Sequence, residues 1–252
     1  MLTPKTFLIV CPLVFLAGLV DSIAGGGGLI SLPAYLIAGL PVHGAIATNK
    51  MSSSCGTFTT TVRFLKHGLV NIRIAIPTVI AAIVGSSLGA RLSLHLPEDI
   101  LRRILLFVLP VVAFFVLNPK LFKDREESKT QVTGKTIAIA VLAAFLIGMY
   151  DGLYGPGTGT FLIIAFTVFA KLSIRTANAQ AKCINLASNI TALVLFLLSG
   201  SVIVPLGLAA AACNVAGNLI GSGIVMDKGA QVVRPIILVV LVLLLLRALG
   251  VY

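Results

Sequence analysis

Charged residues are scarce in this chain of 252 residues. They make up 11% of the sequence, whereas 58% of the residues are hydrophobic; an ordinary soluble domain has about 25% charged residues. At a mean hydropathy of +1.08, apolar side chains outnumber the positions that a water-soluble fold could cover with a polar shell. The composition therefore excludes an ordinary soluble protein and predicts that lipid surrounds most of the surface.

The motifs of soluble chemistry are missing too. The four cysteines lie in apolar stretches without metal-ligand spacing, and the sequence has no HxxxH pair and no G-x-S-x-G, Walker or Rossmann motif. We therefore expect no enzymatic activity, no metal and no cofactor, and interpret the cysteines as small core residues. The net charge of +11 does not indicate nucleic acid, because no basic helix is interleaved with aromatic residues; excess Lys and Arg also orients membrane proteins.

The sequence does contain a series of apolar segments. A helix needs about 20 residues to cross roughly 30 Å of hydrocarbon, and most of the segments can do so. Two of them, 29–42 and 159–170, are short and follow glycine-rich breaks, which is typical of broken or re-entrant helices. We therefore predict an all-α polytopic membrane protein. Its apolar segments are 6–24, 29–42, 44–65, 72–94, 101–118, 134–150, 159–170, 176–199, 202–226 and 232–250.

An internal repeat relates the two ends of the chain. The motif Asp21-Ser-Ile-Ala-Gly-Gly-Gly-Gly aligns with Asp151-Gly-Leu-Tyr-Gly-Pro-Gly-Thr at a shift of 130 residues, and later positions align at 132. Glycines and charged residues are scarce in lipid-facing helices, so their coincidence over many positions at nearly the same shift is not expected by chance. We therefore predict two transmembrane repeats, 1–118 and 134–252, joined by a polar linker at 119–133. The later matches pair Lys50 with Lys182, Gly85 with Gly217, Gly89 with Gly221 and Arg102 with Arg234.

Two topologies compete. Ten elements, in two sets of five with the amino end outside, place 12 basic residues in the cytoplasm and 4 outside. Eight crossings, with the amino end inside, place 9 inside and 7 outside. The positive-inside rule favours ten elements, and a repeat with an odd number of elements inverts its second copy. We therefore favour inverted five-plus-five repeats with a cytoplasmic linker.

Four ionisable residues lie within apolar segments and match by the repeat: Asp21 with Asp151, and Lys50 with Lys182. Each such group costs about 2.5 to 3.5 kcal/mol at the bilayer centre, so a membrane scaffold without a use for them would avoid four. One interpretation is a structural ion pair within each half, Asp21 with Lys50 and Asp151 with Lys182. The other makes the lysines the cationic side of an anion site, since an ammonium offers three donors and a full charge.

The glycine-rich breaks favour the anion site. Each break can expose backbone N–H groups at the start of the next short helix, where free donors and the helix dipole attract anions. The alternative is that glycines only allow close helix packing, the role we assign to the Gly-xxx-Gly pairs that begin at Gly85 and Gly217. The candidate binding glycines are Gly26, Gly27, Gly28, Gly157 and Gly159.

Polar residues beside the lysines complete the candidate site. Their hydrogen bonds could replace the hydration that a bound anion loses, although each could instead join neighbouring helices. The candidate ligands are Asn49, Ser53, Gln180 and Asn185, and the other polar neighbours are Thr48, Ser52, Ser54, Asn178, Ser188 and Asn189.

Asp21 and Asp151 are the candidate coupling residues. They precede the glycine breaks, so proton binding at one or both could accompany a rearrangement of the glycine-hinged half-helices. The alternative is that both aspartates only cap the short helices.

The paired glycine-rich motifs, the Ala-Thr-Asn-Lys50 and Ala-Gln-Ala-Lys182 segments and the length near 250 residues resemble the TauE/SafE sulfite exporter family of membrane permeases. The resemblance implies transport of small sulfur-containing anions, such as sulfite or organosulfonates, across the cytoplasmic (inner) membrane of a prokaryote. The second half departs from a perfect copy, because Ala181 stands opposite Asn49 and Pro156 opposite Gly26. We therefore expect two unequal half-sites.

Together these features predict a multi-pass secondary active transporter that binds a small anionic substrate and works by alternating access. No ATP-binding sequence is present, so an ion gradient, with protons as the candidate, or the substrate's own gradient must supply the energy. The alternatives are an anion channel and a structural membrane subunit that transports nothing. A homodimer is one assembly that the sequence leaves open.

The charge distribution generates a test of topology. We expect single cysteines introduced at Leu2 and at Lys123 to be labelled from opposite sides of the membrane, and one at Tyr252 to be labelled from the same side as Leu2. A membrane-impermeant thiol reagent on right-side-out and inverted vesicles, in a variant without the native cysteines, makes the measurement. Labelling of positions 2 and 123 from one side would contradict the five-plus-five arrangement.

Overall fold

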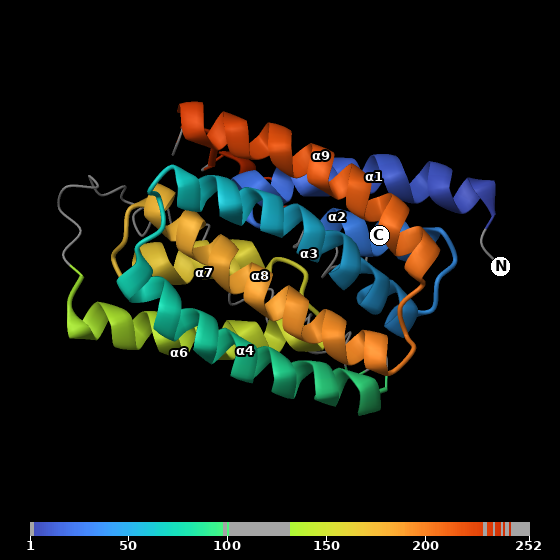
Figure 1. The fold of residues 1–252 in the computed structure, drawn as a ribbon, viewed down its shortest axis with the longest axis horizontal. Coiled ribbons are helices and arrows are strands. Elements are labelled where there is room, and N and C mark those ends of the chain that lie inside the picture. The colour runs from blue at the N-terminus through green and yellow to red at the C-terminus, as the bar shows by residue number, and fades with distance from the viewer. Residues whose placement is uncertain are drawn as a thin grey trace.

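The computed structural model describes residues 3–97, 100 and 132–228, together with residues 231–233, 235–237, 239 and 242. In residues 3–97 and 132–228 the chain forms eight α-helices and no strands (Figure 1). This confirms the predicted all-helical class. The predicted segment at 101–118, and most of the linker and of the segment at 232–250, lie outside the described residues. The helices are α1 (Pro4–Ala24), α2 (Gly28–Ile37), α3 (Val42–Lys66), α4 (Ile72–His95), α6 (Gly134–Leu153), α7 (Thr158–Val168), α8 (Ile174–Leu198) and α9 (Val204–Lys228).

Helix ends follow the residues that favour them. Gly25, with φ 75°, ends α1, and Gly157, with φ 83°, precedes α7, because glycine adopts the left-handed conformation without strain. The side chains of Asn71 and Ser173 accept hydrogen bonds from the first turns of α4 and α8. The ends of the eight described helices lie within about five residues of the ends of the predicted segments.

The helices form two sets with the same order of lengths. The first set, α1 to α4, has 21, 10, 25 and 24 residues, and the second, α6 to α9, has 20, 11, 25 and 25. In Figure 1, α1 and α3 run from right to left, whereas α6 and α8 run from left to right. The side chains of α3 agree with this direction, since Lys50 reaches Asn189 while Thr61 reaches the Lys182 carbonyl, an antiparallel register with α8.

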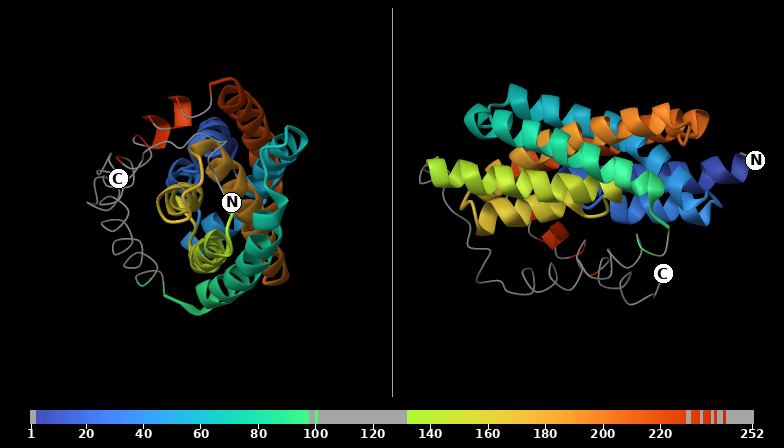
Figure 2. Two further views of the ribbon diagram at one scale, coloured as in Figure 1. Left: turned by 90° about the vertical axis from the view of Figure 1, so that its left-hand side faces the viewer. Right: turned by 90° about the horizontal axis from the view of Figure 1, so that it is seen from below.

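Helices of one set pack closely on helices of the other. Seen from below, the axes of the long helices lie roughly parallel to one another, whichever way the chain runs (Figure 2, right). α1 packs along α9, and α4 packs along α6. An added Cβ at Gly217 would overlap the Phe15 carbonyl of α1, and one at Gly85 would overlap the Phe145 carbonyl of α6. Gly221 and Gly89 lie just as close to the next turns of α1 and α6. The predicted packing role of both Gly-xxx-Gly pairs is confirmed.

Many polar side chains and several charged side chains of the long helices lie inside the bundle, whereas many large apolar side chains lie on its outer surface. Among the described residues, five helices are long and apolar enough to cross a membrane: α1, α4, α6, α8 and α9. α3 has the length, but its inward face carries Thr48, Lys50, Thr57 and Thr60, all buried. Outward-facing Leu8 and Leu198 are 76% and 81% exposed. This distribution is that of a multi-pass membrane protein, whose apolar exterior contacts lipid.

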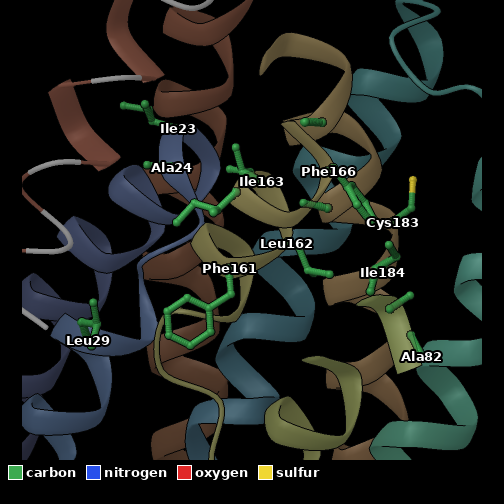
Figure 3. Packing of buried hydrophobic residues seen from close by; sticks show 14 of the residues in the cluster. Ile23, Ala24, Leu29, Ala82, Phe161, Leu162, Ile163, Phe166, Cys183 and Ile184 are labelled. Carbon is green, nitrogen blue, oxygen red and sulfur yellow. The ribbon is translucent and has the colours of Figure 1, made fainter. Parts of the chain in front are cut away.

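An apolar cluster surrounds the two glycine breaks. Ile23, Ala24 and Leu29 flank the first break, and Phe161 and Leu162 follow the second (Figure 3). Cys183 belongs to this cluster, as expected of a core cysteine, but Cys55 is exposed, so the core interpretation is wrong for Cys55. The cluster encloses the breaks with side chains from both sets.

The glycine contacts generate a stability prediction. We expect Gly89→Ala to lower the unfolding free energy by about 1 to 3 kcal/mol, because the new methyl group would press on the Met149 carbonyl of α6. The matched control is Gly134→Ala, since a Cβ at Gly134 meets nothing within 4 Å. Thermal unfolding of both purified variants in detergent makes the comparison. Equal melting temperatures for the two variants would contradict the packing role of Gly89.

Candidate functional site

The first buried ion pair joins α3 to α6. Lys50 Nζ lies 2.8 Å from Asp151 Oδ2, and the two side chains are 2% and 3% exposed. Lys50 Nζ also donates a hydrogen bond of 2.9 Å to Asn189 Oδ1 on α8. The lysine is therefore held by one helix through charge and by another through a side-chain amide.

The second ion pair joins α8 to the end of α1. Lys182 Nζ lies 2.9 Å from Asp21 Oδ2, with exposed fractions of 0% and 12% for the two side chains. The same ammonium donates to the main-chain carbonyl oxygen of Asp21. Lys182 thus also binds the last turn of α1, next to the first glycine break.

Each pair links the two sets. The interpretation in which Asp21 pairs with Lys50 and Asp151 with Lys182 is wrong, because each lysine binds the aspartate of the other set. Since the lysines lie on the two antiparallel helices α3 and α8, each ammonium faces the glycine break of the opposite set. Two ammonium groups and two carboxylates together make the candidate site neutral in its fully ionised state.

The surroundings of Asp151 are rich in donors. Its Oδ1 accepts a hydrogen bond of 2.8 Å from the Thr158 hydroxyl, and its Oδ2 accepts one from the Ser188 hydroxyl. Asn185 Oδ1 accepts a bond of 3.1 Å from Asn189, the residue that binds Lys50. The predicted ligand Asn185 therefore lies in the network around Lys50, and Ser188 and Asn189, named only as polar neighbours, make the direct contacts.

The glycine breaks meet each other. Gly25 and Gly159 approach so closely that a Cβ on either would overlap the other's main chain. The Thr160 hydroxyl donates a hydrogen bond of 2.6 Å to the Ala24 carbonyl, which fastens α7 to the end of α1. Both breaks, and the two ion pairs beside them, therefore belong to one central region.

The breaks also leave backbone donors free. Within residues 3–97 and 132–228, no acceptor binds the N–H groups of the predicted glycines, Gly26, Gly27, Gly28, Gly157 and Gly159. The residues that precede α2 and α7 are Gly27 and Gly157, which have no capping side chain. The interpretation that Asp21 and Asp151 cap the short helices is wrong, since these carboxylates bind ammonium and hydroxyl groups.

Three predicted ligands lie away from the ion pairs. Gln180 Nε2 donates to the Asn71 carbonyl at 2.8 Å, at the start of α4. Asn49 and Ser53 are partly exposed, and the Ser53 hydroxyl donates to Asn49 Oδ1 at 3.5 Å. None of the three has a hydrogen bond to a lysine or an aspartate of the ion pairs among the described residues.

Two further polar side chains are buried in the bundle: Asn178, which the sequence indicates only as a polar neighbour, and Thr57, which was not among the predicted residues. Asn178 Nδ2 donates to the Ser22 and Ile23 carbonyls, while its Oδ1 has no partner in the described part of the chain. Thr57 is fully buried, and its hydroxyl likewise has no partner there. A helical period of about 3.6 residues from Lys50 and Lys182 would have placed both on the inward faces of α3 and α8.

The sequence is similar to that of a known protein family over almost its whole length. The family described as sulfite exporter TauE/SafE matches residues 10–248. "Probable membrane transporter protein ORF9" of Sinorhizobium sp is 36% identical over 94% of this chain and 89% of its own. "Probable membrane transporter protein YfcA" of Escherichia coli (strain K12) is 35% identical over 95% of this chain and 88% of its own. No solved structure is significantly similar to the chain.

The crossed ion pairs generate a test by compensation. We expect Lys182→Met to lower the unfolding free energy by about 3 to 5 kcal/mol, because it leaves a buried carboxylate without its partner. Asp21→Asn should restore most of this loss when added to Lys182→Met, since it removes the unpaired charge. Thermal unfolding of the single and double variants makes the measurement.

The matched control is Asp151→Asn added to Lys182→Met. This double variant should be no more stable than Lys182→Met alone, because Asp151 pairs with Lys50. Rescue by Asp151→Asn but not by Asp21→Asn would contradict the crossed pairing.

Proposed function

The chain belongs to the TauE/SafE sulfite exporter family of membrane transporters, and we propose that it is a secondary active transporter of small sulfur-containing anions, of the sulfite or organosulfonate type. In this proposal it works by alternating access in the cytoplasmic membrane of a prokaryote. The observation that carries the proposal is the pair of buried lysines, each bound to an aspartate of the other set beside a glycine break.

The neutrality of the site sets a condition on anion binding. A buried lysine that is already paired offers no net charge to an anion, and an added charge in a buried site is costly unless it is compensated. Protonation of one aspartate releases its lysine and leaves the site with one positive charge. A monovalent anion, such as hydrogensulfite or a sulfonate, that arrives with one proton then restores neutrality, so we propose that protons are the coupling ions and that Asp21 or Asp151 binds them.

The donors around the pairs suit an anion with several oxygen atoms. Besides the two ammonium groups, the free N–H groups of Gly26 to Gly28 and of Gly157 and Gly159 lie at the starts of α2 and α7, where the helix dipole favours negative charge. A sulfite or sulfonate group presents three oxygen acceptors to such donors. Membership of the sulfite exporter family supports the sulfur-containing class of substrate.

We propose that alternating access uses inverted repeats. The opposite directions of α1 and α6, and of α3 and α8, support this arrangement. In such transporters one repeat or bundle moves against another around a fixed central site. Because each ion pair joins the two sets, release of a lysine by a protonated aspartate removes one of the bonds that hold the sets in their present positions.

Flux measurements test the proposal. We expect the purified protein in liposomes to carry sulfite, and an acidic pH on the side of loading to accelerate the uptake. Asp21→Asn or Asp151→Asn should abolish the acceleration, because an amide cannot take up the coupling proton. Asp227→Asn is the matched control, since Asp227 is an exposed acid near the end of α9.

The other outcomes separate the alternatives. If both site variants respond to the pH gradient as the wild type does, the aspartates are not the coupling groups. Sulfite flux without any response of the wild type to the pH gradient contradicts proton coupling and leaves a channel or a carrier driven by another gradient. Absence of flux for every small anion tested, in protein that is folded, indicates a structural subunit.

A further inference from the structure

The two half-sites differ in the side chains that surround their ion pairs. Asp151 accepts hydrogen bonds from Thr158 and Ser188, and Lys50 donates to Asn189. The repeat places Gly28 opposite Thr158, Gly56 opposite Ser188 and Thr57 opposite Asn189. The pair of Lys182 and Asp21 therefore lacks both hydroxyl donors that hold Asp151.

The two aspartate side chains also differ in their exposure. The Asp151 side chain is 3% exposed, whereas that of Asp21 is 12% exposed. Asp151 is held by an ammonium and two hydroxyls from three different helices, α3, α7 and α8. Asp21 is thus the aspartate that can leave its lysine with the smaller loss of hydrogen bonds.

The repeat assigns Thr57 to the half-site of Lys182, and the Thr57 hydroxyl has no hydrogen-bond partner among the described residues. Thr57 occupies the repeat position of Asn189, whose amide oxygen binds Lys50. The Thr57 side chain is 0% exposed. A buried hydroxyl without a partner lowers stability, so it calls for a reason such as a bound ligand.

Asp151 shows how this fold holds a negatively charged group. Its carboxylate is surrounded by an ammonium, a hydroxyl from the neighbouring long helix and a hydroxyl at the start of a short helix. The half-site of Lys182 has an ammonium beside the start of α2, where the N–H groups of Gly27 and Gly28 are free, and the repeat assigns to it the buried, unpartnered hydroxyl of Thr57 on α3. The half-site of Lys182 thus has the same kinds of hydrogen-bond donor as the surroundings of Asp151, but only its ammonium binds a carboxylate among the described residues.

We propose that the transported anion binds in the half-site of Lys182 and that the Thr57 hydroxyl donates a hydrogen bond to one of its oxygens. This inference rests on the proposed function and narrows it. Lys182 supplies the charge once Asp21 has taken up a proton, and α2 supplies backbone donors. The half-site of Lys50 keeps its own carboxylate, Asp151, and holds the two sets together.

The experiment compares three conservative variants of the full chain. Thr57→Val removes the hydroxyl at nearly constant volume, and Thr57→Ser keeps it. Thr167→Val is the matched control, because Thr167 is also buried with a hydroxyl that has no partner in the described residues, and it lies near the end of α7. The dissociation constants of sodium sulfite and sodium ethanesulfonate are measured by calorimetry, and thermal unfolding is measured without any anion.

We expect Thr57→Val to weaken binding of the anion that the wild type binds by about ten-fold or more, which is the loss of one hydrogen bond to a charged group. Thr57→Ser should stay within about three-fold of the wild type, and Thr167→Val should bind as the wild type does. The melting temperature without anion should not fall in either valine variant, because each loses an unpaired hydroxyl.

Several results would overturn this assignment. Wild-type affinity in Thr57→Val shows that the hydroxyl does not touch the anion. A lower melting temperature of Thr57→Val without anion, at unchanged affinity, shows a structural role. If the folded wild type binds neither probe nor any other small anion, the proposed function fails and this inference fails with it.

Discussion

Two lysines buried in a membrane bundle require partners, and in this protein each partner belongs to the other set of helices. Lys50 binds Asp151 and Lys182 binds Asp21. An isolated charge at this depth would be expensive, so the two sets must interlock for either charge to be tolerated. The close packing of α1 on α9 and of α4 on α6 meets this requirement, because it brings the ends of α1 and α6 to the lysines.

Glycine allows the main chains of the two sets of helices to come into close contact. Where α1 meets α9 and α4 meets α6, the repeat places glycines in matching positions, and where the two breaks meet, Gly25 lies against Gly159. These contacts bring main chains together and leave the polar side chains to fill the centre. The result is a membrane protein whose interior carries its charges and whose exterior carries leucine and isoleucine. The same centre offers free backbone N–H groups, so the elements that make the fold possible also supply donors for an anion.

Much of this architecture follows from local sequence. Apolar runs and glycine breaks locate the described helices, because a helix in lipid must satisfy its own backbone and a glycine-rich stretch ends it. The partners of the lysines could not be predicted, since Asp21 lies 29 residues before Lys50 and Asp151 lies 31 before Lys182, and both spacings suit a pair within one set equally well. Which contact forms depends on how the sets pack. Gln180 is close to Lys182 in sequence, but residues two apart face different sides of a helix, whereas Asn178 and Asn185 share more of the face of Lys182.

The crossed pairs also bear on how the protein is made. While only α1 to α4 have left the ribosome, Lys50 and Asp21 lack the partners that they have in the folded bundle, because Asp151 and Lys182 have not yet been synthesised. α1 likewise has no α9 beside it, and the glycines of α4 have no α6. The early half therefore cannot form the ion pairs of the folded bundle until the later half has been synthesised. Neither set of helices holds the partners of its own buried charges, so neither set can complete its ion pairs alone.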